Sequence, residues 1–313
     1  MSLVNHPLEV SDLRKRYPNS PKEAVRGVSF EVKAGEIFGL LGPNGAGKTS
    51  IISTITTLEK PTSGVVKVFG VDVTKDPMFT KKQLGIVHQE VINSGFFTVE
   101  EILKFHSGYY GLRKNQERIL FLLEKLSLLE HRDKKVKQLS GGMKRRLMIA
   151  KALVHNPKLL LLDEPTAGVD IRLREDLWRF VQELRSEGMS ILLTTHYLEE
   201  AEELCDRVGI INFGNVVHVG NTKEIIREYS LKKIRLILTE DFPLESEYIK
   251  EKGESSYLLV VPQQMTIGDI LTELKIPMQF IKDVEIQNGD LEEAFLKLVS
   301  RTESSDNSSQ ARI

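Results

Sequence analysis

Short apolar runs alternate with longer amphipathic stretches over the first two-thirds of the chain. Residues 159–162, 190–194 and 208–211 form mostly continuous apolar runs, a pattern typical of parallel strands that are covered on both faces. Residues 172–187 and 198–204 separate these runs and have the spacing of helices. Four further strands and one helix are expected at residues 28–32, 36–41, 65–69, 84–87 and 47–58. The alternation predicts an α/β domain around a mainly parallel sheet.

One region interrupts this alternation. Residues 98–108, 116–129 and 143–155 are helical in pattern, and no strand is expected among them. We therefore expect a helical subdomain, inserted into the α/β domain at about residues 92–156.

The last third of the chain has smaller elements. Beyond about Asn221 we expect short strands and helices at residues 234–239, 257–261, 267–274, 284–287 and 291–299. The predicted organisation is an α/β domain (residues 1–225), a small α+β domain (226–301) and a serine-rich tail (302–313), whose polar composition predicts disorder.

Composition narrows the possible functions. The net charge of −1 provides no general attraction for nucleic acid. Cys205 is the single cysteine, which excludes an internal disulfide and fits a reducing compartment. No segment approaches the roughly 20 apolar residues that span a bilayer. If the protein works at a membrane, other polypeptides must provide the span.

The first motif with clear chemistry follows the strand expected at residues 36–41. Gly42-x-x-x-x-Gly47-Lys48-Thr49 matches the complete P-loop pattern, in the strand-to-helix context that this pattern requires. Its backbone amides can surround phosphates, Lys48 can reach the β- and γ-phosphates, and Thr49 can bind Mg²⁺. The spacing excludes the dinucleotide fingerprint G-x-G-x-x-G. The motif predicts a nucleoside triphosphate site.

Two adjacent carboxylates follow the apolar run at residues 159–162. Asp163 ends the expected strand, where a carboxylate can hold Mg²⁺ or its water. Glu164 follows it and is expected to project elsewhere, which would free it to act as the general base for the attacking water. The pair adds hydrolysis to the predicted binding of a nucleotide.

A glycine-rich turn, Leu139-Ser140-Gly141-Gly142-Met143, has no obvious task in that site. Its hydroxyl and glycine amides have the chemistry of a second phosphate cradle, and the helix expected at residues 143–155 would direct its positive end toward it. Because one P-loop already surrounds one nucleotide, the second cradle indicates that two copies of the chain meet. Each copy would then cover the nucleotide of the other.

In these motifs the chain resembles the nucleotide-binding subunit of an ATP-binding-cassette (ABC) transporter, over about residues 8–225. The resemblance implies a P-loop NTPase core with an inserted helical subdomain and ATP and Mg²⁺ as ligands. It also implies a homodimer or a paired ABC subunit, joined to integral-membrane permease subunits. The nucleotide-binding residues would be Tyr17, Gly42, Pro43, Asn44, Gly45, Ala46, Gly47, Lys48, Thr49, Ser50, Ser140, Gly141 and Gly142.

The resemblance also assigns roles to single residues. Gln89 would contact Mg²⁺ and the attacking water, so that the metal ligands would be Thr49, Gln89 and Asp163. The switch histidine would be His196, which would contact the γ-phosphate. The catalytic set would therefore be Glu164, His196, Gln89 and Lys48.

Two further roles rest on the same resemblance. Asp170 would belong to a loop that crosses the dimer interface. Tyr17 would stack on adenine, although an ordinary half-buried tyrosine remains the alternative.

The sequence departs from the common family pattern near the glycine-rich turn. Met143 stands where glutamine is usual, and His88 stands where many relatives have proline. Lys144, Arg145 and Arg146 place positive charge at the start of a helix, which disfavours the helix unless a phosphate or an acidic partner is near. The alternative is a solvated basic turn.

Residues 139–170 and 194–202 are similar to ATPase subunits of ABC-2-type exporters. Tyr197, which follows the switch histidine, and residues 291–295 add to this similarity. Aromatic residues within 91–111 are either core or a groove for a helix of a membrane subunit. The sequence thus predicts an exporter ATPase in the cytoplasm, peripheral on the inner face of the cell membrane. An importer subunit and a soluble non-transport ABC ATPase are the alternatives, and the transported substrate is not indicated.

Overall fold

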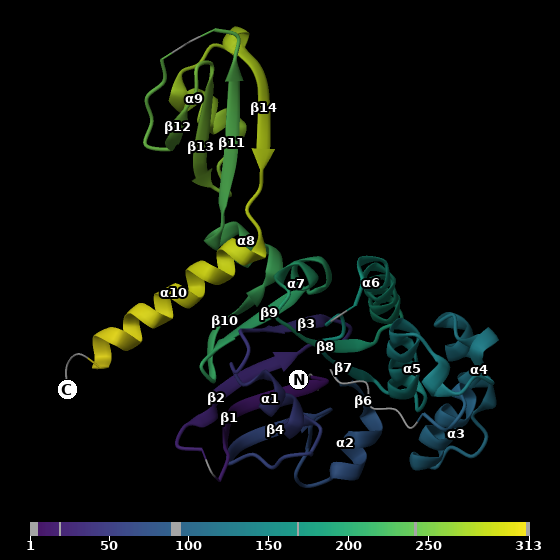
Figure 1. Cartoon of the computed structure of the whole chain (residues 1–313). Helices are drawn as coiled ribbons and strands as arrows, with labels where there is room; N and C mark the ends of the chain where they lie inside the picture. Colours follow the sequence, from purple (N-terminus) through teal and green to yellow (C-terminus); the bar gives the residue numbers. More distant parts are fainter. Residues whose placement is uncertain (1–5, 19, 89–94, 168, 241–242, 311–313) are drawn as a thin grey trace, which may run out of the picture. The chain divides into compact units, whose positions relative to one another are not determined.

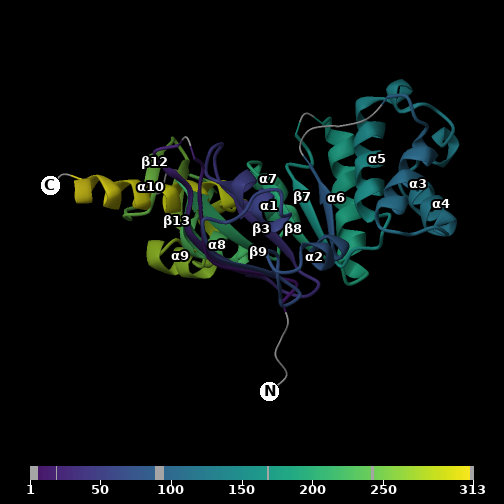
Figure 2. The same ribbon diagram turned by 90° about the horizontal axis from the view of Figure 1, so that it is seen from below.

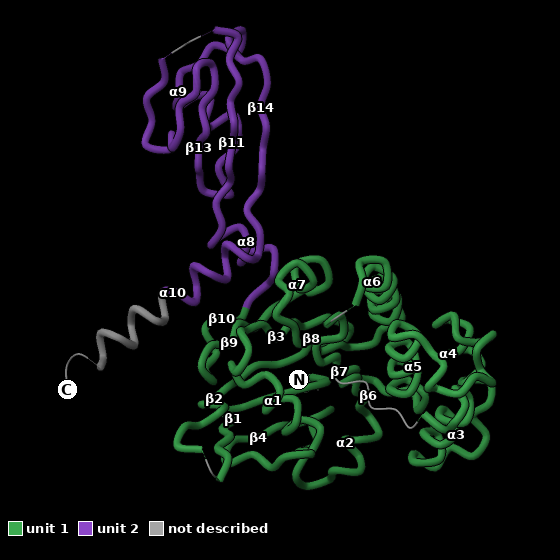
Figure 3. The backbone as a smooth tube through the Cα atoms, viewed as in Figure 1, with its two compact units in different colours: residues 1–219 green, residues 220–313 purple. Residues whose placement is uncertain are grey.

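The computed structural model describes residues 6–18, 20–88, 95–167, 169–240 and 243–310, and side chains as far as residue 300. It divides the chain into two compact units, residues 1–219 and 220–313 (Figure 3). From the sequence we expect this boundary after residue 225.

The first unit is organised around a six-stranded sheet in the order β10-β9-β3-β8-β7-β6 (Figure 1). The neighbouring pairs from β9 to β6 in this order are parallel. Every residue of β3, β7 and β8 is buried, because helices and a second sheet cover both faces. The strands are β3 (Ile37–Leu41), β6 (Leu84–Val87), β7 (Leu159–Asp163), β8 (Ser190–Thr195), β9 (Arg207–Asn212) and β10 (Asn215–Asn221).

A second sheet in this unit has the order β2-β1-β4-β5 and is antiparallel. Its apolar side shares one core with the parallel sheet, in which the rings of Phe30 and Phe38 stack with centroids 5.3 Å apart. Its strands are β1 (Leu8–Arg16), β2 (Glu23–Val32), β4 (Ser63–Val68) and β5 (Val71–Asp72), and two helices lie nearby in the chain, α1 (Lys48–Ile55) and α2 (Pro77–Gln83).

The helical subdomain lies at the β6 end of the parallel sheet (Figures 1 and 2). It contains α3 (Val99–Tyr109), α4 (Gln116–Lys125) and α5 (Gly141–Leu153), together with the 3₁₀ helices Leu129–His131 and Val136–Gln138. Thr98 and Glu101 form a capping box that fixes the start of α3.

Two more helices complete the first unit, α6 (Ile171–Ser186) and α7 (Leu198–Leu204). Buried side chains on α6 recur at the spacing of one helix face, at residues 173, 177, 181 and 184. The predicted α/β core with an inserted helical subdomain is therefore confirmed.

The second unit has a four-stranded antiparallel sheet in the order β12-β13-β11-β14. Its core contains Ile234, Leu236, Tyr257 and Leu259. The elements are α8 (Thr222–Tyr229), β11 (Leu231–Leu238), β12 (Ile249–Lys252), β13 (Ser256–Pro262), α9 (Ile267–Leu274), a 3₁₀ turn (Met278–Phe280), β14 (Ile281–Gln287) and α10 (Leu291–Gln310). The disorder expected beyond residue 301 stays a prediction.

Within the described part of the chain, the helices are all too short or too polar to cross a membrane.

Candidate functional site

The loop between β3 and α1 has a backbone that only glycine allows at several points. Gly45 and Gly47 have φ of +81° and +108°. A Cβ added at Gly42 would lie 2.3 Å from the Ile211 carbonyl oxygen, whereas no described atom beyond its chain neighbours lies within 4 Å of a Cβ placed at Gly45. Pro43, Asn44 and Gly45 are exposed. The loop is therefore anchored at its ends and open at its centre, as a cradle for phosphates requires.

Gly42→Ala is expected to destabilise the protein by about 1–3 kcal/mol, because the new methyl group overlaps the backbone of β9 and must displace the loop. ATP affinity should fall as well. Urea unfolding and ATP titration would measure both effects. Gly108→Ala in α3 is the matched control, since the space around Gly108 is open and alanine favours a helix. Wild-type stability and affinity in the Gly42 variant would contradict this reading of the loop.

Lys48 lies at the start of α1 and points back across the loop. Its Nζ donates to the carbonyl oxygens of Gly42 (2.6 Å) and Pro43 (3.2 Å) and lies 3.9 Å from Glu164 Oε1. Burial lowers the pKa of Lys48, and the charges of Glu164 and Asp163 act in the opposite direction. A buried cation with a nearby carboxylate marks this end of the sheet as a functional site.

Glu164 follows β7 in an unusual conformation. Its φ is +46°, in the left-handed region that residues with a Cβ rarely occupy. Its amide donates to the Thr194 carbonyl oxygen (2.9 Å), and its Oε1 lies 3.2 Å from His196 Nδ1. The structure thus brings together Lys48, Glu164 and His196, which are far apart in the sequence.

Asp163 is the last residue of β7 and directly precedes Glu164. The Asp163 carboxylate turns toward the neighbouring strand, where Oδ1 accepts a hydrogen bond from Thr194 Oγ1 (2.5 Å). Thr49 lies exposed in the first turn of α1. Both side chains offer oxygen atoms, the ligand type that Mg²⁺ prefers.

Of the remaining residues of the expected nucleotide site, the structure describes Tyr17 and Ser50. Tyr17 follows β1, is partly buried, and its hydroxyl lies 3.2 Å from Ser50 Oγ on α1. The Lys15 ammonium lies 4.9 Å from the centre of the Tyr17 ring. Gln89 lies outside the described residues.

The glycine-rich turn belongs to a helix rather than preceding one. We expected a helix from residue 143, but α5 begins at Gly141, because Ser140 caps it: Ser140 Oγ accepts from the Met143 amide (3.3 Å). Gly142 packs closely on α6, where an added Cβ would lie 2.6 Å from Leu173 Cδ2. The glycines therefore form the first turn of α5.

This first turn opens onto a groove of about 620 Å³. The groove is lined by the start of α5, by the loop that contains Asp170, and by the start of α6. The Asp170 side chain caps α6 by accepting from the Leu173 amide (3.0 Å). Residues of the P-loop are not part of this lining. The two phosphate-type cradles of one chain thus open at separate places.

Arg145 is the residue whose position the sequence did not reveal. It was expected in a basic turn facing solvent or a partner, yet it is 4% exposed. Its guanidinium donates to the carbonyl oxygens of Pro165 (2.7 Å), His88 (2.7 Å) and Glu164 (2.8 Å). Arg145 precedes the buried residues Met148 and Ile149 by three and four positions, a periodicity that places it on the buried face of α5.

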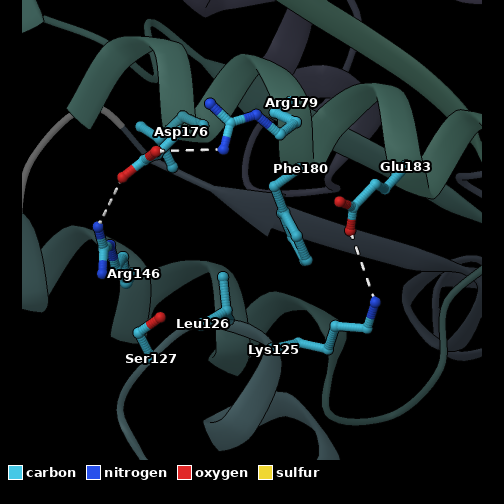
Figure 4. Close-up of a pocket in the computed structure, with 9 residues that line it drawn as sticks. Lys125, Leu126, Ser127, Arg146, Asp176, Arg179, Phe180 and Glu183 are labelled. Carbon is cyan, nitrogen blue, oxygen red and sulfur yellow. Dashed lines mark hydrogen bonds and ion pairs between the residues drawn. The ribbon is translucent and has the colours of Figure 1, made fainter. Parts of the chain in front are cut away.

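The next arginine faces a different pocket, of about 180 Å³, between α4, α5 and α6 (Figure 4). There Arg146 pairs with Asp176 (3.0 Å), and Lys125 pairs with Glu183 (3.6 Å). Such exposed pairs contribute about 0–1 kcal/mol each. They connect the helical subdomain to α6 without burying charge.

Comparisons with known proteins agree with the site. The ABC transporter family model matches residues 25–167. The chain is 34% identical to the linearmycin resistance ATP-binding protein LnrL of Bacillus subtilis (strain 168), over 94% of this chain and 99% of the relative. It is 41% identical to the Nod factor export ATP-binding protein I of Burkholderia orbicola (strain AU 1054), over 83% and 88%.

Among solved structures, a dimeric post-hydrolysis state of the ATP-binding cassette MJ0796, bound to ADP and Pi, matches with a TM-score of 0.62 and 25% identity, over 68% of this chain and 98% of that one. The P-loop, the carboxylates after β7 and these relatives together show that the chain is an ATP-hydrolysing enzyme and belongs to the ATP-binding subunits of ABC transporters.

Proposed function

We propose that this chain is the ATPase motor of an exporter and works as a dimer that encloses two ATP molecules. The observation that carries the proposal is the cluster of Lys48, Glu164 and His196 beside the P-loop. The second phosphate cradle of the same chain, residues 140–142, opens onto a groove that the P-loop does not line. Export is supported by two relatives, one named for Nod factor export and one for linearmycin resistance.

The P-loop would hold the triphosphate. The amides of residues 42–49 would surround the phosphates, and Lys48 would exchange its loop carbonyl contacts for phosphate oxygens. Tyr17 would support the base. The contact between its hydroxyl group and that of Ser50 would hold Tyr17 beside the first turn of α1. This arrangement binds ATP mainly through its phosphates.

Thr49 and Asp163 would hold Mg²⁺, with Gln89 as a third proposed ligand. When bound, the ion neutralises charge on the β- and γ-phosphates. The Asp163 carboxylate is fixed for such a role by the hydrogen bond from Thr194.

Glu164 would accept the proton of the attacking water as general base. His196 lies 3.2 Å from the same carboxylate and would orient it while contacting the γ-phosphate. Lys48 would stabilise the charge that develops on the phosphate oxygens. These three side chains supply positioning and charge, which is most of what phosphoryl transfer needs.

The second chain would complete each site. Ser140 and the amides of Gly141 and Gly142 lie at the positive end of α5, a 13-residue helix, and would cover the phosphates held by the partner. The dimeric state of MJ0796 supports this arrangement. Met143 cannot replace the hydrogen bond of a glutamine amide, so closure would depend on backbone contacts.

Coupling to a permease would use an exposed aromatic surface on the helical subdomain, formed by Phe96, Phe105 and Tyr109. Their exposed fractions are 82%, 45% and 78%. Phe105 and Tyr109 lie on α3, and Phe96 lies shortly before it in the chain. Exposed apolar patches are typical of protein interfaces. The chain would then bind permease subunits through this surface, on the inner face of the cell membrane.

Replacing Phe96 and Tyr109 with serine is expected to abolish co-purification of a membrane permease with the tagged chain, and to leave ATP affinity unchanged. The reason is that both side chains are exposed and belong to the helical subdomain rather than to the P-loop. Pull-down from detergent-solubilised membranes, with identification of the partner, is the measurement. Leu58→Ser is the matched control, because Leu58 is 65% exposed but lies after α1.

Retention of the permease by the double variant would contradict the assigned surface. Recovery of the wild-type chain with ribosomes, and without a permease, would contradict the exporter proposal as a whole.

A further inference from the structure

The conformation of Glu164 needs support from its surroundings. A residue with a Cβ is disfavoured at φ +46°, so this backbone persists only where neighbouring groups hold it. The conformation has a consequence for the site, since it sets the direction from which the carboxylate meets Lys48 and His196. Whatever holds the Glu164 backbone therefore also aims the side chain.

Hydrogen bonds hold the peptide groups on both sides of the Glu164 Cα. The Glu164 amide donates to the Thr194 carbonyl oxygen on β8 (2.9 Å). The Glu164 carbonyl oxygen accepts from Arg145 Nη2 (2.8 Å), and the following carbonyl, that of Pro165, accepts from Arg145 Nε (2.7 Å). The planar guanidinium fixes the direction of both bonds, so it holds two successive peptide groups at once.

The same guanidinium reaches a second loop. Its Nη1 donates to the carbonyl oxygen of His88, directly after β6 (2.7 Å). Arg145 itself lies in the second turn of α5, five residues after the capping Ser140. One buried side chain thus joins the start of α5 to the loops that follow β6 and β7.

Arg145 is a buried cation, and three backbone carbonyl groups accept hydrogen bonds from it. Burial lowers the pKa of Arg145, and the charges of Asp163 and Glu200 oppose that effect. The buried carbonyl oxygens that it serves would lose a partner if the guanidinium were removed. Its contacts are with backbone groups of site residues, and the position of those groups is what the site depends on.

We infer that Arg145 is a positioning residue for ATP hydrolysis, which holds Glu164 in its left-handed conformation and ties the N-terminal half of α5 to both loops. The inference rests on the proposed function, because it takes Glu164 as the general base. Arg145 acts through Glu164, and the predicted consequence of its loss is a slower hydrolytic step with ATP binding retained.

The test compares Arg145→Met and Arg145→Lys in the full-length chain. Steady-state hydrolysis gives kcat and KM, titration with a fluorescent ATP analogue gives Kd, and thermal unfolding gives Tm. Arg145→Met should lower kcat by roughly 100-fold, the size of effect that follows from a small misplacement of a reacting group, while KM and Kd stay near wild type. Arg145→Lys should recover part of kcat, since an ammonium group can still donate to some of these carbonyls.

Arg118→Met is the matched control. Arg118 is a partly buried arginine of the same subdomain, with a pKa lowered by burial, and it donates to the Leu153 carbonyl oxygen at the far end of α5 (3.4 Å). Its replacement should lower Tm and leave kcat unchanged. The comparison separates a general loss of packing in the subdomain from a specific loss of positioning.

A kcat within about twofold of wild type for Arg145→Met would overturn the inference. So would a loss of kcat no larger than that of Arg118→Met at the same loss of Tm. If Arg145→Met does not fold, the lysine variant decides: a lowered kcat at unchanged KM supports the inference, and a wild-type kcat overturns it.

Glu164→Gln, measured in the same assay, separates this inference from the proposed function. If Glu164→Gln turns over ATP at the wild-type rate, the proposed general base is wrong. If Glu164→Gln is inactive and Arg145→Met is fully active, only the positioning role fails.

Discussion

Glu164→Gln is expected to lower the rate of ATP hydrolysis by roughly 10²–10⁴-fold, which is the usual contribution of a general base. The amide keeps the shape of the side chain but cannot accept the proton of the attacking water. ATP binding should persist, because Lys48 and the P-loop amides are unchanged. Phosphate release under steady-state conditions measures the first effect, and ATP titration measures the second.

The same variant should accumulate as a dimer in the presence of ATP. Hydrolysis reopens the proposed dimer, so blocking it traps the closed form. Size-exclusion chromatography with and without ATP would show this. Glu199→Gln is the matched control, because Glu199 lies close to His196 in sequence but its side chain is 78% exposed and pairs with Arg174. Turnover at the wild-type rate in Glu164→Gln would remove Glu164 from the proposed role.

Ser140→Arg is expected to reduce turnover to background while ATP still binds to each isolated chain. A guanidinium at the N-cap of α5 would fill the groove beside Gly141 and Gly142, and it would replace a cap that contributes about 1 kcal/mol. The P-loop is not part of that groove, so its own affinity should survive. Hydrolysis and ATP titration on the same preparation measure the two effects.

A matched substitution elsewhere separates helix capping from catalysis. Thr266 caps α9 in the second unit and accepts from the Asp269 amide, so Thr266→Arg removes a similar cap far from the nucleotide motifs in sequence. It should lower stability by a similar amount and leave turnover unchanged. Full activity of Ser140→Arg would contradict a role for the α5 turn in hydrolysis.

Much of the parallel sheet could be predicted because its strands are short apolar runs with no competing pattern. β6, β7 and β8 lie where the runs at residues 84–87, 159–162 and 190–194 were found. β1 was missed, since its alternation is broken by an irregular pairing between Ser11 and Arg14, where Asp12 has φ of +44°. β12 was missed for a different reason: its residues 249–252 are mostly charged and exposed.

In the candidate site, local motifs could be predicted from the sequence, whereas contacts between distant segments could not. The P-loop is a local motif, so its residues could be named from spacing alone. The proximity of Lys48, Glu164 and His196 depends on the order of β3, β7 and β8 in the sheet, which spacing does not give. Their roles stay predictions.

Arg145 illustrates why charge misleads at such a site. Three successive basic residues after Met143 indicate a turn that faces a phosphate, an acidic partner or solvent, and burying a cation is costly unless it is hydrogen-bonded. The cost is offset here by three carbonyl groups that come from two separate loops and that no local pattern reveals. The one available sign was its helical spacing from Met148 and Ile149.

Complementation between two inactive variants tests whether each ATP site is completed by the second chain. Lys48→Ala and Ser140→Arg chains should each be inactive alone. When they are mixed in equal amounts before ATP is added, a mixed dimer has one site with both defects and one intact site. Hydrolysis should then recover to roughly a quarter of the wild-type rate, since random pairing puts about half of the chains in mixed dimers with one working site. A mixture that stays as inactive as its two components would contradict the shared site.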